Sequence, residues 1–317
     1  MENPSQALKV GGGSVPVTPA TVMPADIRDW FLLLKPRVIL LVVFTGAAAL
    51  LVAPGRIHPV LALTAILCIA VGAGAAGAIN MWYDRDIDAV MRRTAKRPIP
   101  DGRIAAGDAL GFGIALAVGS VLLMFLASNA AAAVTLAISI AFYVFVYTMW
   151  LKRRTPQNIV IGGAAGAFPP VIGWAAVTGT VDIMPLLMFA IIFFWTPPHF
   201  WALSLYAHGD YARAGVPMLP VVSGPRTTRR HVFAYTVVLA CVAMLPWLLG
   251  YAGPVYGVGA ALLGAFFLVS STRLLLDRQD ADGRSLTNDA PARRTFKYSL
   301  TYLFALFFII SVDHFIR

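Results

Sequence analysis

Three oxygen-bearing residues spaced by four, Asn80, Asp84 and Asp88, interrupt a long apolar stretch of this 317-residue chain. On a helix, each step of four residues moves a side chain only about 40° around the axis, so all three share one face, whereas Asp86 points away. Two carboxylates and an amide oxygen suit Mg²⁺, which binds one or two protein carboxylates together with substrate phosphate oxygens. We therefore predict that Asn80, Asp84 and Asp88 are metal ligands and catalytic residues.

Basic residues follow these oxygens in the same loop and recur in a second one. The string "MRRTAKRPIPDGRI" at 91–104 includes Arg103 and two stiffening prolines, and "LKRR" occupies 151–154. Convergent Lys and Arg beside a metal indicate a diphosphate site. We predict that four of these side chains bind the diphosphate: Lys96, Arg97, Lys152 and Arg153.

Each of these patterns also has a simpler explanation. The aspartates at the helix end could pair with Arg85, Arg92 or Arg93 and hold no ligand. An acid at the membrane edge suggests a functional site, but its position alone does not establish one. The basic string at 151–154 could anchor the topology of a membrane protein and bind no phosphate.

The elements that position these residues are expected to be membrane-spanning helices. The chain is 59% hydrophobic and 13% charged with a mean hydropathy of +0.75, and its apolar runs of about 20 residues can each cross a bilayer. The fold class is therefore all-α, a polytopic membrane bundle of nine helices. The expected spans are 38–53, 60–82, 106–127, 130–150, 158–178, 184–206, 231–251, 254–271 and 297–315.

The distribution of positive charge orients these spans. Of the 25 Lys and Arg residues, 23 fall on one side when nine spans are threaded in order, so this side is cytoplasmic and the net charge of +10 does not indicate nucleic acid. We expect a bacterial inner membrane protein, or a mitochondrial inner membrane protein in a eukaryote, with a cytoplasmic N-terminus and a periplasmic C-terminus. The long catalytic loops lie on the cytoplasmic side.

The N-terminal residues differ in composition from the rest. Residues 1–30 are polar and include "GGGSVPVTPA" at 11–20, so we expect a disordered tail, followed by one intramembrane domain over 31–317. The segment "DIRDWFLLLKPR" at 26–37 carries both charge signs around apolar residues and is expected to lie along the interface before the first span.

The charged strings resemble a known family. "NMWYDRDID" at 80–88 and "KRPIPDGR" at 96–103 are similar to the first signature of the UbiA-type intramembrane prenyltransferases. This resemblance covers about residues 30–315. It implies a nine-helix bundle that takes an isoprenyl diphosphate as substrate and Mg²⁺ as cofactor.

Three further strings resemble the members of this family that act on heme: 147–174, 195–206 and 210–222. The resemblance implies transfer of a farnesyl group from farnesyl diphosphate to a vinyl group of heme B, with addition of water, giving heme O and diphosphate. The implied partners are farnesyl diphosphate, heme B and the lipid bilayer. A downstream heme A-forming enzyme or a terminal oxidase assembly is a further candidate partner.

The same resemblance assigns three residues to the acceptor side: His199, Asp210 and Tyr147. His199 follows two prolines and could contact the heme iron or a propionate; the alternative is a histidine satisfied by a carbonyl freed at the proline kink. Tyr147 could bond a phosphate oxygen or water, or serve as an interfacial anchor. Quinone-type members carry a second D-x-x-x-D motif, whereas here Asp210 is followed by Ala214.

Two other functions remain as alternatives. A prenyltransferase with a quinone-type aromatic acceptor has the same fold, and the missing second aspartate pair argues against it. A membrane transporter would place charges near the midplane or break helices in paired halves, whereas here the acids lie at one edge and no inverted repeat is visible.

Overall fold

The computed structural model describes residues 25–317. The regular secondary structure of this part of the chain is helical, apart from one isolated β-bridge between Gln279 and Ser285. The long helices are α2 (Pro36–Val52), α3 (Pro59–Tyr83), α5 (Ala106–Ala127), α6 (Ala130–Ala141) continued by the π-helix η1 (Phe142–Leu151), α7 (Asn158–Ala167) followed by α8 (Pro169–Thr178), α9 (Ile183–Tyr206), α12 (Gly224–Leu248), α13 (Pro254–Leu275) and α14 (Ala290–Ile316). The short helices are α1 (Ile27–Leu33), α4 (Arg85–Val90), α10 (His208–Arg213) and α11 (Leu219–Val222).

The predicted helical membrane bundle is confirmed. Eight helical segments of the described chain are long and apolar enough to span a bilayer, and α1 with α2, bent by 54°, provides the ninth. The bend occurs at Lys35, whose φ of 56° lies in the left-handed region, followed by Pro36 at the start of α2.

Helix bounds differ from the expected spans mainly at two polar ends. Helices α12 and α14 begin at Gly224 and Ala290, each seven residues before the predicted start of its span at 231 or 297. Their first turns are rich in Arg and Thr, so hydropathy omits them although the backbone is already helical.

The predicted tail needs one correction. Helix α1 begins at Ile27, so the last residues of the range 1–30 belong to an ordered helix, and residues 1–24 lie outside the described part of the chain. The predicted disorder there stays a prediction. The segment expected at the interface forms the separate helix α1, with Ile27 and Phe31 exposed, and its place along the membrane interface stays a prediction.

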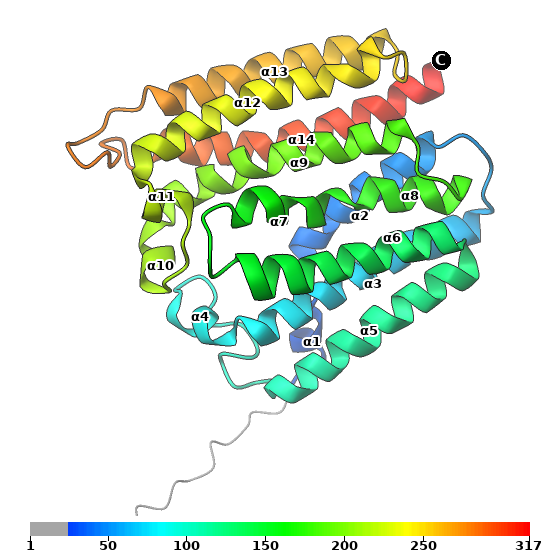
Figure 1. The fold of residues 1–317 in the computed structure, drawn as a ribbon, viewed down its shortest axis with the longest axis horizontal. Coiled ribbons are helices and arrows are strands. Elements are labelled where there is room, and N and C mark those ends of the chain that lie inside the picture. Colours follow the sequence, from blue (N-terminus) through cyan, green and yellow to red (C-terminus); the bar gives the residue numbers. More distant parts are fainter. Residues whose placement is uncertain (1–24) are drawn as a thin grey trace, which may run out of the picture.

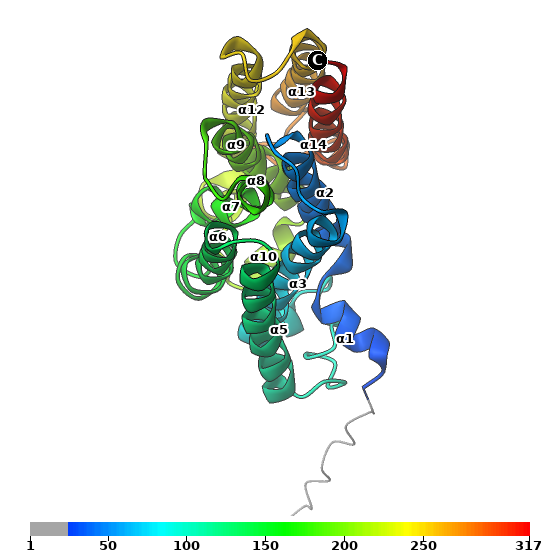
Figure 2. The same ribbon diagram turned by 90° about the vertical axis from the view of Figure 1, so that its right-hand side faces the viewer.

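The helices lie side by side in an elongated arrangement (Figure 1). Helices α3, α5 and α6 form one flank, α12, α13 and α14 the other, and α2, α8 and α9 lie between them. Figure 2 shows the same order from the side. The short helices α4, α10 and α11 and the long α13–α14 connection gather at one end, and the C-terminus lies at the other.

Small residues allow these helices to approach one another closely. A Cβ atom added to Gly173 of α8 would lie 2.2 Å from the carbonyl oxygen of Gly46 on α2, and one added to Gly162 of α7 would lie 2.1 Å from the Tyr147 ring. The glycines at these positions therefore permit close approach between α8 and α2 and between α7 and η1.

Apolar side chains cover both the interior and the outer surface. A core of buried residues from α2, α8, α9, α12, α13 and α14 includes Trp195, Phe267 and Tyr302. Large apolar side chains such as Leu40, Leu126 and Phe145 are exposed on the outside. A water-soluble protein rarely exposes so much contiguous apolar surface, so this surface faces lipid and the chain is an integral membrane protein.

Candidate functional site

The three oxygen-bearing residues lie on one buried face, as helix geometry predicts. Helix α3 ends at Tyr83 and α4 begins at Arg85, but Asp84 N–H donates to Asn80 O at 2.9 Å and Asp88 N–H to Asp84 O at 2.8 Å, so the spacing by four is kept through the break. Asn80, Asp84 and Asp88 are at most 3% exposed, whereas the Asp86 side chain is 60% exposed.

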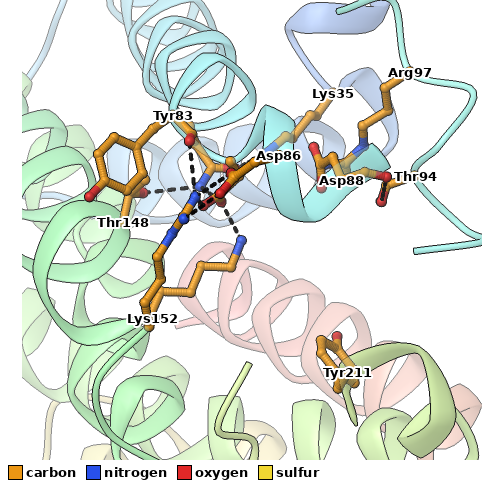
Figure 3. Close-up of polar contacts among 12 residues, drawn as sticks. Lys35, Tyr83, Asp86, Asp88, Thr94, Arg97, Thr148, Lys152 and Tyr211 are labelled. Atoms are coloured by element: carbon orange, nitrogen blue, oxygen red, sulfur yellow. Dashed lines mark hydrogen bonds and ion pairs between the residues drawn. The ribbon is translucent and has the colours of Figure 1, made fainter. Parts of the chain in front are cut away.

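Asn80 makes hydrogen bonds with three side chains, those of Lys35, Asp84 and Thr148, and Figure 3 labels two of these partners, Lys35 and Thr148. Its amide oxygen accepts a hydrogen bond of 2.6 Å from Lys35 Nζ, which reaches across from the α1–α2 turn. Its amide nitrogen donates to Asp84 Oδ2 at 2.7 Å and to the Thr148 hydroxyl at 3.1 Å. Segments far apart in the sequence therefore converge on one side chain.

Each buried carboxylate has a basic partner from another segment. Lys152 bonds Asp84 Oδ2, Arg153 lies 3.4 Å from Asp84 Oδ1, and Arg97 donates to Asp88 Oδ2 at 2.5 Å. The carboxylates are nearly inaccessible while these basic side chains are 17–31% exposed. We call the following residues the carboxylate cluster: Lys35, Asn80, Asp84, Asp88, Arg97, Thr148 and Lys152.

The acids do pair with basic residues, but not with those named in the simpler explanation. Arg85 lies against Trp82 and donates to its carbonyl oxygen at 2.8 Å, and Arg93 donates to the Tyr211 hydroxyl at 3.2 Å. The expectation that the aspartates pair with Arg85, Arg92 or Arg93 is therefore wrong. The actual partners are three of the predicted diphosphate-binding residues, Arg97, Lys152 and Arg153, while Lys35 bonds the Asn80 amide oxygen.

Asp86 is paired outside the cluster, as its orientation suggested. Arg153 donates to both Asp86 oxygens, at 2.6 and 2.7 Å. These hydrogen bonds hold the pKa of the Asp86 carboxyl below its usual range and raise the pKa of Arg153. Arg153 thus contacts both Asp84 and Asp86. Unlike Arg97 and Lys152, it already binds both oxygens of one carboxylate, that of Asp86.

The π-helix η1 presents residues to the cluster. Lys152 N–H donates to Tyr147 O, five residues earlier, at 2.9 Å, and this wider turn is followed by the Lys152 side chain that reaches Asp84. Such segments are frequent at functional sites. The predicted residue Tyr147 packs its ring against Tyr143, with 5.3 Å between centroids, while the adjacent Thr148 bonds Asn80.

Two basic residues of the first loop lie elsewhere. The Lys96 side chain is exposed. Its backbone carbonyl oxygen accepts a hydrogen bond of 2.8 Å from the Arg103 guanidinium group. Arg103 pairs with Asp29 of α1 and, at 2.9 Å, with Asp101. The structure therefore separates Lys96 and Arg103 from Arg97, and Arg103 instead fixes the loop onto α1.

His199 is buried in α9 between aromatic rings. Its imidazole stacks on Trp195 at 4.3 Å and on Phe296 of α14 at 4.7 Å, and Nδ1 lies 2.7 Å from the Ser299 hydroxyl. This hydroxyl donates its proton to the Phe296 carbonyl oxygen, so Nδ1 is the donor toward Ser299 and Nε2 keeps a lone pair. The partner is not a carbonyl freed at the proline kink, so that alternative is wrong.

Asp210 does not join the other predicted acceptor residues. On α10 it forms an ion pair with Arg213, three residues later. Its carboxylate is therefore already satisfied within its own short helix.

The sequence analysis missed Lys35 and Thr148. The Lys35 stem packs over Gly77 of α3, where an added Cβ would lie 3.5 Å from Lys35 Cδ, and its ammonium group then reaches Asn80 one turn later. A lysine followed by proline at the start of the first span was an available signal. Thr148 had no signal beyond its position beside Tyr147.

The residues present fit Mg²⁺ only in combination with a substrate. Within the described residues there is no group of three or more His, Cys, Asp or Glu side chains that could hold a metal. Asp84 and Asp88 with the Asn80 amide provide two carboxylates and one neutral oxygen, which is the partial ligand set that Mg²⁺ completes with water and phosphate oxygens.

Comparison with known proteins identifies the family. Residues 40–310 match the UbiA prenyltransferase family. The chain belongs to this family. It is 65% identical over 316 residues to a protoheme IX farnesyltransferase of Granulibacter bethesdensis, covering 98% of this chain and 100% of the relative. It is 66% identical over 294 residues to the enzyme of the same name from Acidiphilium cryptum, covering 93% of each chain.

Solved structures of UbiA relatives share the fold. A digeranylgeranylglyceryl phosphate synthase superposes with a TM-score of 0.73 at 17% identity, covering 92% of this chain and 99% of the other. A UbiA homologue from Archaeoglobus fulgidus, solved with GPP and Mg²⁺ bound, has a TM-score of 0.61 at 17% identity, covering 89% and 99%. As a UbiA prenyltransferase, the chain is an enzyme and not a transporter.

Proposed function

We propose that this UbiA prenyltransferase transfers a farnesyl group from farnesyl diphosphate to a vinyl group of heme B, with addition of water, and produces heme O and diphosphate. The carboxylate cluster is the observation that carries the proposal, because it places acids for a metal and bases for a diphosphate at one point. The heme acceptor is supported by the relatives named protoheme IX farnesyltransferase and by the absence of a second aspartate pair after Asp210.

In this proposal the basic side chains of the cluster leave their present partners, Asn80, Asp84 and Asp88, and bind the substrate instead. Asn80, Asp84 and Asp88 would hold Mg²⁺, which supplies positive charge to the departing diphosphate when bound. Lys35, Arg97 and Lys152, now bonded to those residues, turn their donors toward diphosphate oxygens. Arg153 keeps its two bonds to Asp86 and orients the start of α4. Lys96 is not part of this arrangement.

The basic side chains are suited to stabilise the leaving group. The bond between the allylic carbon and the diphosphate oxygen breaks, and negative charge grows on the diphosphate as the farnesyl group becomes cationic. Once they have turned toward the bound diphosphate, Lys35, Arg97 and Lys152 place their donors beside this growing charge and stabilise it before the bond breaks. The vinyl carbon of heme then bonds to the farnesyl carbon, and water adds to the resulting cation and releases a proton.

The acceptor side is proposed to include His199. Its Nε2 lone pair is available because Nδ1 already donates to Ser299, so it could ligate the heme iron or accept a hydrogen bond. The stacked rings of Trp195 and Phe296 restrict the imidazole to one orientation. Tyr147 lies on the η1 segment that carries the cluster residues and is proposed to line the acceptor side, whereas Asp210 is not.

The chain's location follows from the same arrangement. We propose that the end with the carboxylate cluster faces the cytoplasm in the inner membrane of a bacterium, because the lysines and arginines concentrate there. Heme O could then pass to a heme A-forming enzyme or a terminal oxidase.

The test is an incubation of the purified protein with heme B, farnesyl diphosphate and Mg²⁺, analysed by mass spectrometry. The expected product is heme that has gained one farnesyl group and one hydroxyl group. Replacing heme by 4-hydroxybenzoate tests the quinone-type alternative. Adding EDTA tests whether the reaction needs Mg²⁺. Prenylation of 4-hydroxybenzoate without any conversion of heme would overturn the proposal.

A further inference from the structure

Two arginines outside the carboxylate cluster are held over tyrosine rings near the acceptor histidine. Arg93, in the loop after α4, donates to the Tyr211 hydroxyl at 3.2 Å, and its guanidinium carbon lies 5.9 Å from the ring centroid. Arg293, in the first turn of α14, lies 4.6 Å from the centroid of Tyr206, the last residue of α9. Aromatic rings thus restrict both guanidinium groups.

These two arginines differ from Arg97 and Arg153 in having no acidic partner in the described part of the chain. Within residues 25–317 no carboxylate lies at ion-pair distance from Arg93 or Arg293, whereas Arg97 and Arg153 each contact an aspartate. The further bond recorded for Arg293 is a long one, 3.4 Å, to the Asn288 carbonyl oxygen. Both guanidinium groups are exposed and keep donors for an anion.

Arg293 is connected to His199 through a row of aromatic side chains. Tyr206 lies 6.1 Å from Phe296, and Phe296 stacks on His199 at 4.7 Å, so one aromatic row extends from Arg293 to the histidine. Tyr211, the partner of Arg93, and Tyr206, the partner of Arg293, pack in the same hydrophobic cluster as Phe296. Figure 3 places Tyr211, the partner of Arg93, across from Asp88 and Lys152.

We propose that Arg93 and Arg293 bind the two propionate carboxylates of the porphyrin acceptor. This inference rests on the proposed function. Guanidinium groups bind carboxylates through paired hydrogen bonds, and a guanidinium already held by a ring loses little freedom when it does so. Heme carries its propionates on the edge opposite the vinyl-rich edge. Binding the propionates therefore turns the vinyl-bearing edge of heme away from the two arginines, so that a vinyl group and not a propionate is presented for reaction.

The test compares heme B with its dimethyl ester, in which both propionates are uncharged. Heme is titrated into the purified protein and followed by absorbance. The wild type is expected to bind the ester about tenfold more weakly than heme B, the effect of losing a charge-assisted hydrogen bond. Arg93→Gln and Arg293→Gln are each expected to weaken heme B binding and leave ester binding unchanged, so that the preference for heme B falls toward one.

Matched controls separate binding from folding and from general charge. Arg92→Gln and Arg294→Gln remove neighbouring exposed arginines and are expected to leave the preference intact. Arg293→Lys is expected to retain part of it. Equal binding of heme B and its ester by the wild type, or equal loss of both ligands in the Gln variants, overturns the inference. Turnover in the same preparations reports on the proposed function separately, since the titration requires no reaction.

Discussion

Two buried acidic sites lie at the same end of the bundle, and their partners differ in kind. The carboxylate cluster holds Asp84 and Asp88 with basic side chains from separate segments that remain partly exposed. The second site, which we call the Asp277 clasp, consists of Arg229, Asp277, Ser285 and Thr287 at the α13–α14 connection.

The Asp277 clasp is closed. The hydroxyls of Ser285 and Thr287 donate to the two Asp277 oxygens at 2.6 and 2.7 Å, and the Arg229 and Asp277 side chains are each only 1% exposed. Arg229 also donates to the Gly283 carbonyl oxygen at 2.7 Å. These partners belong to one loop and the adjacent helix, so they hold the connection in shape. Arg229 Nε has no hydrogen-bond partner within residues 25–317, but it is buried and not accessible to a ligand from solvent.

The comparison teaches that burial of an acid does not identify a functional site by itself. An acid whose hydrogen-bond partners are buried with it has a structural role, because a ligand could displace these partners only by leaving a buried charge unpaired. Long basic side chains with solvent access can leave a carboxylate when a metal and an anion arrive. The predictions below ask whether this distinction holds.

The largest expected effect is loss of turnover in Asp84→Asn and Asp88→Asn. Each removes one of two proposed carboxylate ligands, so farnesyl transfer is expected to fall by about a hundredfold or more, as when a main electrostatic group is lost. Product is measured by mass spectrometry in protein that still elutes as a folded species. Asp86→Asn is the control and is expected to retain most activity; an equal loss there would remove the distinction between the two faces of the helix.

The next effect is on stability, in the Asp277 clasp. Asp277→Ala leaves Arg229 buried without its carboxylate and is expected to cost about 3–5 kcal/mol of folding free energy. The measurement is the thermal unfolding midpoint in detergent. The double variant Asp277→Leu with Arg229→Met removes both charges and is expected to recover much of the loss. A midpoint for Asp277→Ala near that of the wild type would show that the clasp does not stabilise the fold.

A smaller loss is expected for Lys35, the residue that sequence analysis missed. Lys35→Met removes one of three donors proposed for the diphosphate, so kcat/KM for farnesyl diphosphate is expected to fall about tenfold, with heme affinity unchanged. Arg37→Met, two residues away and exposed, is the matched control. If the two variants behave alike, Lys35 serves only to anchor the first span.

The smallest effect is expected for Thr148. Thr148→Val keeps the side-chain shape and removes the hydroxyl that accepts from the Asn80 amide at 3.1 Å, a bond that contributes about 1 kcal/mol. Turnover is expected to fall several-fold through misplacement of Asn80. Steady-state kinetics in the wild type and variant provide the measurement, and unchanged values would mean that Lys35 and Asp84 orient Asn80 without Thr148.

Much of the fold could be predicted because its signals are local. Long apolar runs predict spans, and the spacing by four predicts that Asn80, Asp84 and Asp88 share a buried face. The beginnings of α12 and α14 could not be predicted from hydropathy, because their first turns are polar although helical.

The missed parts of the site depend on tertiary structure. Lys35 reaches Asn80 only because the chain turns at a left-handed residue and packs over Gly77. The neighbours Lys96 and Arg97 look equivalent in sequence, but the turn that carries them directs only Arg97 toward Asp88. The bond between His199 and Ser299 joins residues a hundred positions apart, and no local pattern indicates it.

The central claim is that the carboxylate cluster exists to bind a ligand and the Asp277 clasp exists to hold the fold. The most direct test is the thermal shift caused by farnesyl diphosphate with Mg²⁺, measured in the wild type, Asp84→Asn and Asp277→Asn. At about 100 times Kd, the ligand should stabilise the wild type by about 2.7 kcal/mol. We expect Asp277→Asn to start from a lower midpoint but show the full shift, and Asp84→Asn to show no shift. A full shift in Asp84→Asn would contradict the account.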